Sequence, residues 1–185
     1  MIAAKGASVL DADVVVHELE RRGQPVWQAI VDHFGPGLLL PSGELDRAAL
    51  GRLVFSDSQA LADLEKLVHP AVRQEMRRRI AEEPAGRILC VDAIKLIESG
   101  MAAACDSVWV VTASAEERAR RLQRDRGLNE DVAWQRIQAQ TPQEEKLPLA
   151  AVVIDNNGLL AATQSQVNEA WERTVAPWLA GGSLA

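Results

Sequence analysis

The stretch Val9-Leu10-Asp11-Ala12-Asp13 places an apolar run directly before two carboxylates. Such a run is typical of a buried strand that ends at the ligand-binding edge of a parallel sheet. Asp11 and Asp13 share one strand face if the strand extends that far, because side chains alternate along a strand. A carboxylate there can accept a proton from a substrate hydroxyl or help to hold Mg²⁺. Asp13 could equally cap a helix that begins at Val14, and the spacing alone leaves both interpretations open.

Four short apolar runs predict strands, and helical patterns separate them. The runs are 7–10, 87–91, 107–111 and 151–154. They are nearly continuous, which is typical of strands covered on both faces, so the sequence predicts an α/β fold with a parallel sheet between helical layers. Polar residues follow three of these runs, at 11–13, at Asp92 and at 155–157.

The helices have recognisable ends and stripes. The long stretch between the first two strands predicts a helical insertion of about residues 25–85, in which Pro70 suits the first turn of a new helix. Ser114 with Glu117 fits a capping box, and Asn129 fits a second helix start. Val167, Trp171, Val175 and Trp178 predict an amphipathic helix, with a frayed tail at 181–183.

Composition narrows the class of protein. The chain has 185 residues, 48% of them apolar and 25% charged, which predicts one folded domain. Its formal net charge of −6 argues against nucleic-acid and anionic-membrane partners. Cys90 and Cys105 are expected to be core residues in a reducing compartment, no spacing suggests zinc, and no signal peptide or membrane-length apolar run is present. The expected location is the cytoplasm.

Several motifs, in order, resemble those of the dephospho-CoA kinase family over nearly the whole chain. The matching stretches are Gly6-Ala7-Ser8-Val9-Leu10-Asp11-Ala12-Asp13, His33-Phe34-Gly35, Leu45-Asp46-Arg47-Ala48-Ala49-Leu50, Val54-Phe55, Leu67-Val68-His69-Pro70, Arg121-Leu122-Gln123-Arg124-Asp125, Arg136-Ile137-Gln138-Ala139-Gln140, Glu145-Lys146-Leu147 and Val153-Ile154-Asp155-Asn156-Asn157-Gly158. The resemblance rests on their order and spacing together, because each motif alone is weak.

The resemblance implies one three-layer P-loop kinase-like domain over 1–185, with helices on both faces of a parallel sheet. It also implies a CoA-binding helical region at about 25–85 and a lid at about 115–142. The implied reaction transfers the γ-phosphoryl group of ATP, with Mg²⁺, to the ribose 3′-hydroxyl of dephospho-CoA. ATP and dephospho-CoA would be its partners, and no metal-binding residue of the chain is assigned.

The resemblance also implies roles for particular residues. Asp13 matches the family aspartate thought to orient or deprotonate the hydroxyl. Arg124 matches the lid arginine, which would contact the nucleotide and stabilise the charge of the moving phosphoryl group. Neighbouring Arg118, Arg120, Arg121 and Arg126 stay open between lid contacts and a solvated helix face. The nucleotide-binding residues would be Asp155, Asn156 and Asn157, which also suit a turn. The substrate-binding residues would be Asp11, His69, Asp92 and Glu98.

The chain departs from the family pattern in two places. Ile94 and Lys95 stand where the family usually has proline and leucine, and Lys95 is a candidate phosphate contact. No GxxxxGKS/T motif occurs in the 185 residues, so the loop that cradles the phosphates is missing, together with its strand. The segment 2–6 has the pattern of a helix end. We therefore expect an N-terminally truncated, inactive chain with a misplaced start, or alternatively a catalytically dead pseudokinase that binds a CoA-like ligand or a partner.

Overall fold

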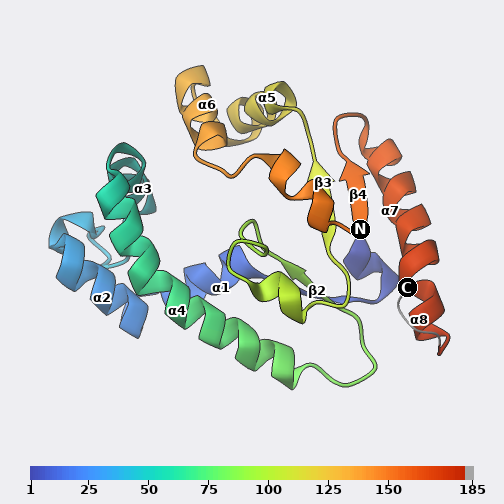
Figure 1. Cartoon of the computed structure of the whole chain (residues 1–185). Helices are drawn as coiled ribbons and strands as arrows, with labels where there is room; N and C mark the ends of the chain where they lie inside the picture. The colour runs from blue at the N-terminus through green and yellow to red at the C-terminus, as the bar shows by residue number, and fades with distance from the viewer. Residues whose placement is uncertain (182–185) are drawn as a thin grey trace. The chain divides into compact units, whose positions relative to one another are not determined.

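The computed structural model describes residues 1–181, which divide into two compact units (Figure 1). Residues 3–94 form one, called the helical unit below. Residues 1–2 and those from 95 onwards form the other, called the C-terminal unit. The short 3₁₀ turn η1 (Ile2–Lys5) ends at Gly6, whose φ of 93° is open to glycine at little cost. The pattern of a helix end at 2–6 therefore corresponds to a single 3₁₀ turn.

The helical unit contains two strands that pair in parallel. They are β1 (Ser8–Asp11) and β2 (Leu89–Asp92), with Ser8 opposite Leu89 and Asp11 opposite Asp92. Both lie within two residues of the predicted runs. Because they are parallel, their carboxyl ends meet at the same edge. Val9 is 48% exposed, so the expected cover on both faces is incomplete along β1.

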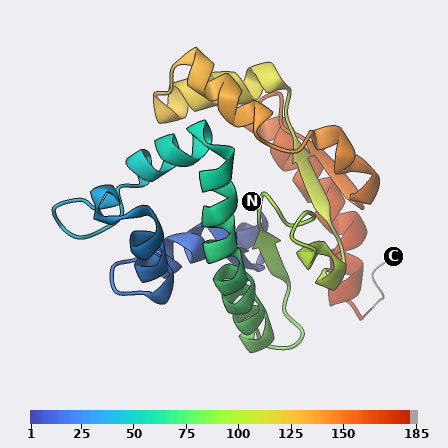
Figure 2. The same ribbon diagram turned by 60° about the vertical axis from the view of Figure 1, so that its left-hand side comes forward.

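Helices make up most of the helical unit. They are α1 (Ala12–Leu19), α2 (Pro25–Phe34), the 3₁₀ turn η2 (Pro36–Leu38), α3 (Arg47–Ser56) and α4 (Ser58–Glu82). The long α4 contacts α1, α2 and α3, as Figure 2 shows from the side. Their shared core consists of Val26, Ile30, Leu45, Leu50, Val54, Ala60 and Val68. In the same unit, buried Glu20 forms an ion pair with Arg47.

Pro70 does not start a helix, contrary to the prediction. It lies inside the continuous helix α4, which runs for 25 residues. Proline removes one backbone hydrogen bond there, yet packing of an apolar face outweighs the local preference of the chain. Buried Val68 and Met76 on either side of Pro70 supply that packing.

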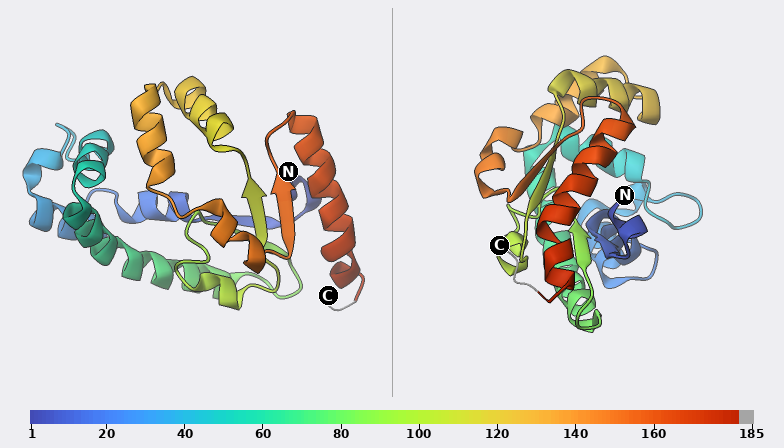
Figure 3. Two further views of the ribbon diagram at one scale, coloured as in Figure 1. Left: turned by 45° about the horizontal axis from the view of Figure 1, so that its top comes forward. Right: turned by 90° about the vertical axis from the view of Figure 1, so that its right-hand side faces the viewer.

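The C-terminal unit is built on a second parallel pair. β3 (Trp109–Thr112) pairs with β4 (Val152–Asp155), and Thr112 lies opposite Asp155. Helix α7 (Leu160–Thr174) runs along β4 (Figure 3), where its Val167 and Ala170 cover Val152 and Ile154. The short α8 (Ala176–Leu179) follows. The predicted amphipathic stripe at the C-terminus is thus split between two helices, and the tail from 182 lies outside the described residues.

Between β3 and β4 the chain forms two packed helices. They are α5 (Ala115–Arg126), capped by Ser114, and α6 (Glu130–Gln138), capped by Asn129, as predicted. The chain returns through the 3₁₀ turns η4 (Gln143–Glu145) and η5 (Leu147–Leu149), and another 3₁₀ turn, η3 (Met101–Ala104), precedes β3. No helix among residues 1–181 is long and apolar enough to cross a membrane.

The prediction of one sheet is corrected by the pairing. The strands of residues 1–181 form two separate two-stranded parallel sheets, β1–β2 and β3–β4. Each of these strands therefore keeps one edge without a strand partner, because each has only one neighbour. Val111 is 58% exposed and Val153 48% exposed, so β3 and β4 are not fully covered by helices either.

Candidate active site

Three carboxylates gather where β1 and β2 end. Asp11 lies directly opposite Asp92 in the strand register, and Asp13 follows in the first turn of α1. We call Asp11, Asp13 and Asp92 the acidic cluster. Like charges placed opposite one another on neighbouring strands destabilise a sheet. Their presence at the carboxyl end of a parallel pair makes this edge a candidate functional site.

The strand ends at Asp11, which changes the roles expected of the first two aspartates. Asp11 Oδ1 accepts hydrogen bonds from the backbone N–H groups of Asp13, at 2.8 Å, and Val14, at 3.2 Å. Asp11, not Asp13, is therefore the N-cap of α1, and the two do not share a strand face. The reason is that Ala12 already adopts helical geometry, so the strand period of two stops before Asp13.

Asp13 is the aspartate with an uncommitted side chain. It is exposed, and within residues 1–181 its carboxylate makes no hydrogen bond or ion pair. Partial removal from water raises the pKa of Asp92, and the charges of Asp11 and Asp13 raise it further. The cluster thus combines a free carboxylate that can accept a proton with a neighbour that resists ionisation.

His69 lies within α4 and is half-buried, between buried Val68 and exposed Pro70. Its position on an interior turn of a long helix comes from the packing of α4 against the other helices. The structure therefore presents His69 from a rigid element, whereas the sequence placed it just before a helix start.

The arginines of α5 differ in how much they are committed to other residues. Arg124 is 71% exposed and pairs with its neighbour Asp125 through two hydrogen bonds of 2.6 and 2.9 Å. That carboxylate raises the pKa of Arg124 and keeps it cationic. Arg120 is 73% exposed and pairs with Glu117. Arg121 is 28% exposed, pairs with Glu117 and donates to the carbonyl of Asn156 at 2.6 Å.

The loop 155–157 is a hydrogen-bonded turn. Asp155 Oδ1 accepts from the backbone N–H and the side-chain amide of Asn157, at 2.8 and 2.6 Å. Asn156 Oδ1 accepts from the hydroxyl of Thr163 at 2.9 Å. Asn157 Oδ1 accepts from the backbone N–H of Ser114 at 2.7 Å, at the start of α5. The turn interpretation of this segment therefore holds, and these polar groups already have protein partners.

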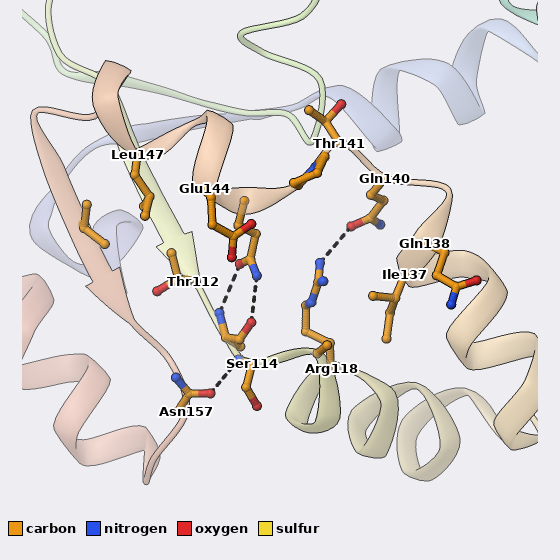
Figure 4. A pocket seen from close by; sticks show the side chains of 15 residues that line it. Thr112, Ser114, Arg118, Ile137, Gln138, Gln140, Thr141, Glu144, Leu147 and Asn157 are labelled. Atoms are coloured by element: carbon orange, nitrogen blue, oxygen red, sulfur yellow. Dashed lines mark hydrogen bonds between the residues drawn. The ribbon is translucent and has the colours of Figure 1, made fainter.

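A cavity of about 560 Å³ lies between the start of α5 and the returning chain (Figure 4). Its lining includes Thr112, Ser114, Arg118, Gln140 and Thr141. Arg118 donates to Gln140 Oε1 at 3.2 Å across it. No sequence motif indicated this cavity, because its walls come from segments separated along the chain.

Glu98 is paired inside the C-terminal unit. Its carboxylate lies 2.9 Å from Lys146 Nζ, and the two side chains are 28% and 16% exposed. Burial opposes ionisation of Glu98, but hydrogen bonds from Lys146, from its own backbone and from Thr141 lower its pKa overall. The sequence proposed Glu98 as a substrate contact, whereas the structure gives it a protein partner that the sequence did not reveal.

Within residues 1–181 no set of three or more His, Cys, Asp or Glu side chains could hold a metal ion. Mg²⁺ usually keeps several waters and takes one or two carboxylates together with substrate phosphates. The described residues fit Mg²⁺ only in that limited sense, as a companion of the nucleotide.

Parallel strands with acidic carboxyl ends, together with an arginine-bearing helical pair, define an α/β protein of the small-molecule kinase class. A model of the family described as dephospho-CoA kinase matches residues 1–162, and the chain belongs to this family of transferases. It is 44% identical over 173 residues to the dephospho-CoA kinase of Symbiobacterium thermophilum, covering 92% of this chain and 72% of that protein. It is 40% identical over 170 residues to that of Geobacter sulfurreducens, covering 91% and 86%.

Solved structures give the same picture of the fold. The crystal structure of TT1252 from Thermus thermophilus has a TM-score of 0.73 and 29% identity, covering 93% of this chain and 87% of that one. Dephospho-CoA kinase from Campylobacter jejuni has a TM-score of 0.63 and 23% identity, covering 92% and 86%, and supports the fold alone.

Proposed function

We propose that the site of this protein serves transfer of the γ-phosphoryl group of ATP to the ribose 3′-hydroxyl of dephospho-CoA, which gives coenzyme A. The observation that carries the proposal is the acidic cluster, in which like charges meet at the end of β1 and β2. Membership of the dephospho-CoA kinase family supplies the substrates. Mg²⁺ would accompany ATP and neutralise phosphate charge.

Asp13 would be the catalytic carboxylate. Its side chain is exposed and uncommitted, so it can accept a hydrogen bond, and then a proton, from the attacking hydroxyl. Asp11 would act mainly through the helix cap that holds Asp13 in place. Asp92 would provide a second substrate-binding carboxyl group at the same edge. His69 would contact the CoA portion from α4.

Arg124 would stabilise negative charge on the moving phosphoryl group. To do so it must exchange Asp125 for phosphate oxygens, which is feasible because the pair is exposed and therefore weak. The turn 155–157 would offer backbone groups to the adenine, since its side chains are engaged elsewhere. Glu98 would act on the substrate indirectly, through Lys146.

The same proposal assigns roles to longer segments of the chain. Residues of about 25–85 would bind the CoA portion, and residues of about 115–142 would be the lid, both within a single domain. The protein would act in the cytoplasm. ATP and dephospho-CoA would be the partners, without nucleic acid or membrane.

We propose further that these 185 residues by themselves have negligible kinase activity. They contain no GxxxxGKS/T motif, and no other segment combines its backbone N–H cradle, lysine and hydroxyl.

The test compares the 185-residue chain with the Geobacter sulfurreducens relative, using ATP and dephospho-CoA. We expect turnover by the relative and none above background by the chain. A chimera in which a strand–GxxxxGKS/T–helix segment of this family precedes Met1 should gain activity. Turnover of the unmodified chain near that of the relative would refute the proposed inactivity. A folded chimera that binds both ligands without turnover would favour a ligand-binding pseudokinase instead.

Within the active chimera, Asp13→Asn isolates the proposed catalytic carboxylate. We expect kcat to fall by roughly 10²–10⁴-fold, with little change in Tm because the side chain has no protein partner. The matched control is Asp131→Asn, an exposed carboxylate in the first turn of α6, which should leave kcat unchanged. Equal activity of both variants would remove Asp13 from the mechanism.

A further inference from the structure

Residues 141–146 form a short segment, called the strap below, that is fastened at both ends. It follows the lid helices and carries the 3₁₀ turn η4. Three of its six residues are exposed, whereas the polar Gln143 is half-buried. A half-buried amide in an otherwise solvated turn calls for hydrogen-bond partners.

Gln143 finds both partners on one residue 30 positions away. Its Oε1 accepts from the backbone N–H of Ala113 at 3.2 Å, and its Nε2 donates to the carbonyl of Ala113 at 2.8 Å. Ala113 is the last residue between β3 and the cap of α5. The amide therefore acts like a neighbouring strand at the point where the chain leaves the sheet for the lid.

Two further contacts stabilise the same point. Asn157 accepts from the backbone N–H of Ser114 at 2.7 Å, next to Ala113 (Figure 4). At the far end of the strap, Lys146 pairs with Glu98 at 2.9 Å. The outgoing and returning ends of the lid are thus held together and tied to the loop that contains Glu98.

We propose that Gln143 is a positioning residue that fixes the start of α5 to the end of β3, and thereby sets the position of Arg124, which α5 carries. This inference rests on the proposed function only in giving α5 a lid role. The hydrogen bonds between Gln143 and Ala113 affect the geometry of α5 whether or not the chain has kinase activity. Gln143 touches no reacting atom in this role and acts through Ala113 and α5.

Hydrogen exchange in the 185-residue chain tests the two hydrogen bonds between Gln143 and Ala113, and it does not require kinase activity. Gln143→Ala should lower protection of the Ala113 and Ser114 amides by about tenfold, because two hydrogen bonds to Ala113 are lost. Gln138→Ala is the matched control, since this exposed glutamine lines the same cavity but makes neither bond. Unchanged protection in Gln143→Ala would overturn the proposal.

Gln143→Glu adds a rescue that a purely structural loss would not show. Above its pKa the carboxylate cannot donate to the Ala113 carbonyl, so protection should fall as in Gln143→Ala. Below about pH 4.3 the protonated acid offers one donor and one acceptor, as the amide does, and protection corrected for intrinsic exchange should recover. Equal protection at both pH values would contradict the paired geometry.

A measurement of ATP binding distinguishes failure of the Gln143 inference from failure of the proposed function. If the lid role holds, Gln143→Ala in the active chimera should weaken ATP binding by about fivefold in titration calorimetry, a modest loss of positioning, whereas Gln138→Ala in the chimera should not. Failure of the chimera without the substitution to bind ATP would count against the proposed function, and the exchange result would still decide whether Gln143 holds Ala113. Normal ATP affinity in Gln143→Ala with loosened Ala113 would refute the positioning role.

Discussion

Asp92 shows how a single residue can be placed against its own electrostatic preference. It ends β2 directly opposite Asp11, and Asp13 adds a third negative charge nearby. A cross-strand pair of like charges costs stability. Asp11 offsets part of that cost by capping α1, but the carboxylates of Asp13 and Asp92 make no hydrogen bond within residues 1–181, which is why the acidic cluster is the best candidate for chemistry.

At the residue scale we predict that Asp92→Asn raises the free energy of unfolding at pH 7 by about 0.5 kcal/mol, because it removes one like charge. The control is Asp155→Asn, which also ends a paired strand but lies opposite Thr112, and which should bring no gain. Urea denaturation of both variants measures the difference.

The pH dependence of this gain has a definite sign. The folded pKa of Asp92 is raised above its ordinary value of 3.8, so the folded state holds the proton more tightly than the unfolded chain. Stability is therefore lost as pH rises from 3.8 through the folded pKa. The advantage of Asp92→Asn should be absent below pH 3.8 and grow above it, and a gain that is largest in acid would contradict this account.

At the scale of elements, α4 carries a proline where helices rarely tolerate one. Pro70→Ala restores a backbone donor in the helix interior and should raise the free energy of unfolding by about 1–3 kcal/mol. Pro25→Ala is the control, because Pro25 lies at the first position of α2, where proline is favourable. Denaturation curves measure both, and an equal response would show that Pro70 imposes no strain on α4.

The strap gives a second prediction at this scale. Glu98→Gln should lower the free energy of unfolding at pH 7 by about 0.5–1 kcal/mol, because it removes the charge attraction between Glu98 and Lys146 in a partly exposed pair. The folded pKa of Glu98 lies below its ordinary 4.5, so its contribution is present above pH 4.5 and is lost as pH falls through the folded pKa.

Thermal unfolding over a pH series provides the measurement for Glu98. The difference between wild type and Glu98→Gln should shrink as pH falls below 4.5, and Glu145→Gln, an exposed neighbour on the strap, should show little difference at any pH. A gap that widened in acid would mean that Glu98 is not stabilised as the ionised form.

At the scale of the whole molecule, each unit has its own apolar cluster. Ile30 is fully buried among α2, α3 and α4, and Ile154 is 1% exposed beneath α7. Ile30→Ala and Ile154→Ala should each cost about 2–5 kcal/mol through lost contacts and cavity formation. Hydrogen exchange should locate the loosening of Ile30→Ala within residues 3–94 and that of Ile154→Ala within 95–181. Loosening in the opposite unit would show that the two clusters act as one.

The sequence by itself determined the local structure and the family. Apolar runs predicted the four strands of residues 1–181, and Ser114 and Asn129 predicted two helix starts, because periodicity and capping depend on residues close together in the chain. Ordered motifs indicated the dephospho-CoA kinase family, which the comparisons confirmed. Asp13 stood out as a carboxylate at the end of a buried strand.

Only the tertiary structure decided which groups are free to act. It made Asp11 the cap and left Asp13 uncommitted, placed Asp92 opposite Asp11, and gave Glu98 and Asn157 protein partners. Gln143 and Ala113 lie 30 residues apart, and Asn157 and Ser114 lie 43 apart. Contacts at such separations depend on how strands pair and helices pack, and no local pattern records them. The residue types at this site follow from the sequence, whereas their roles follow from the fold.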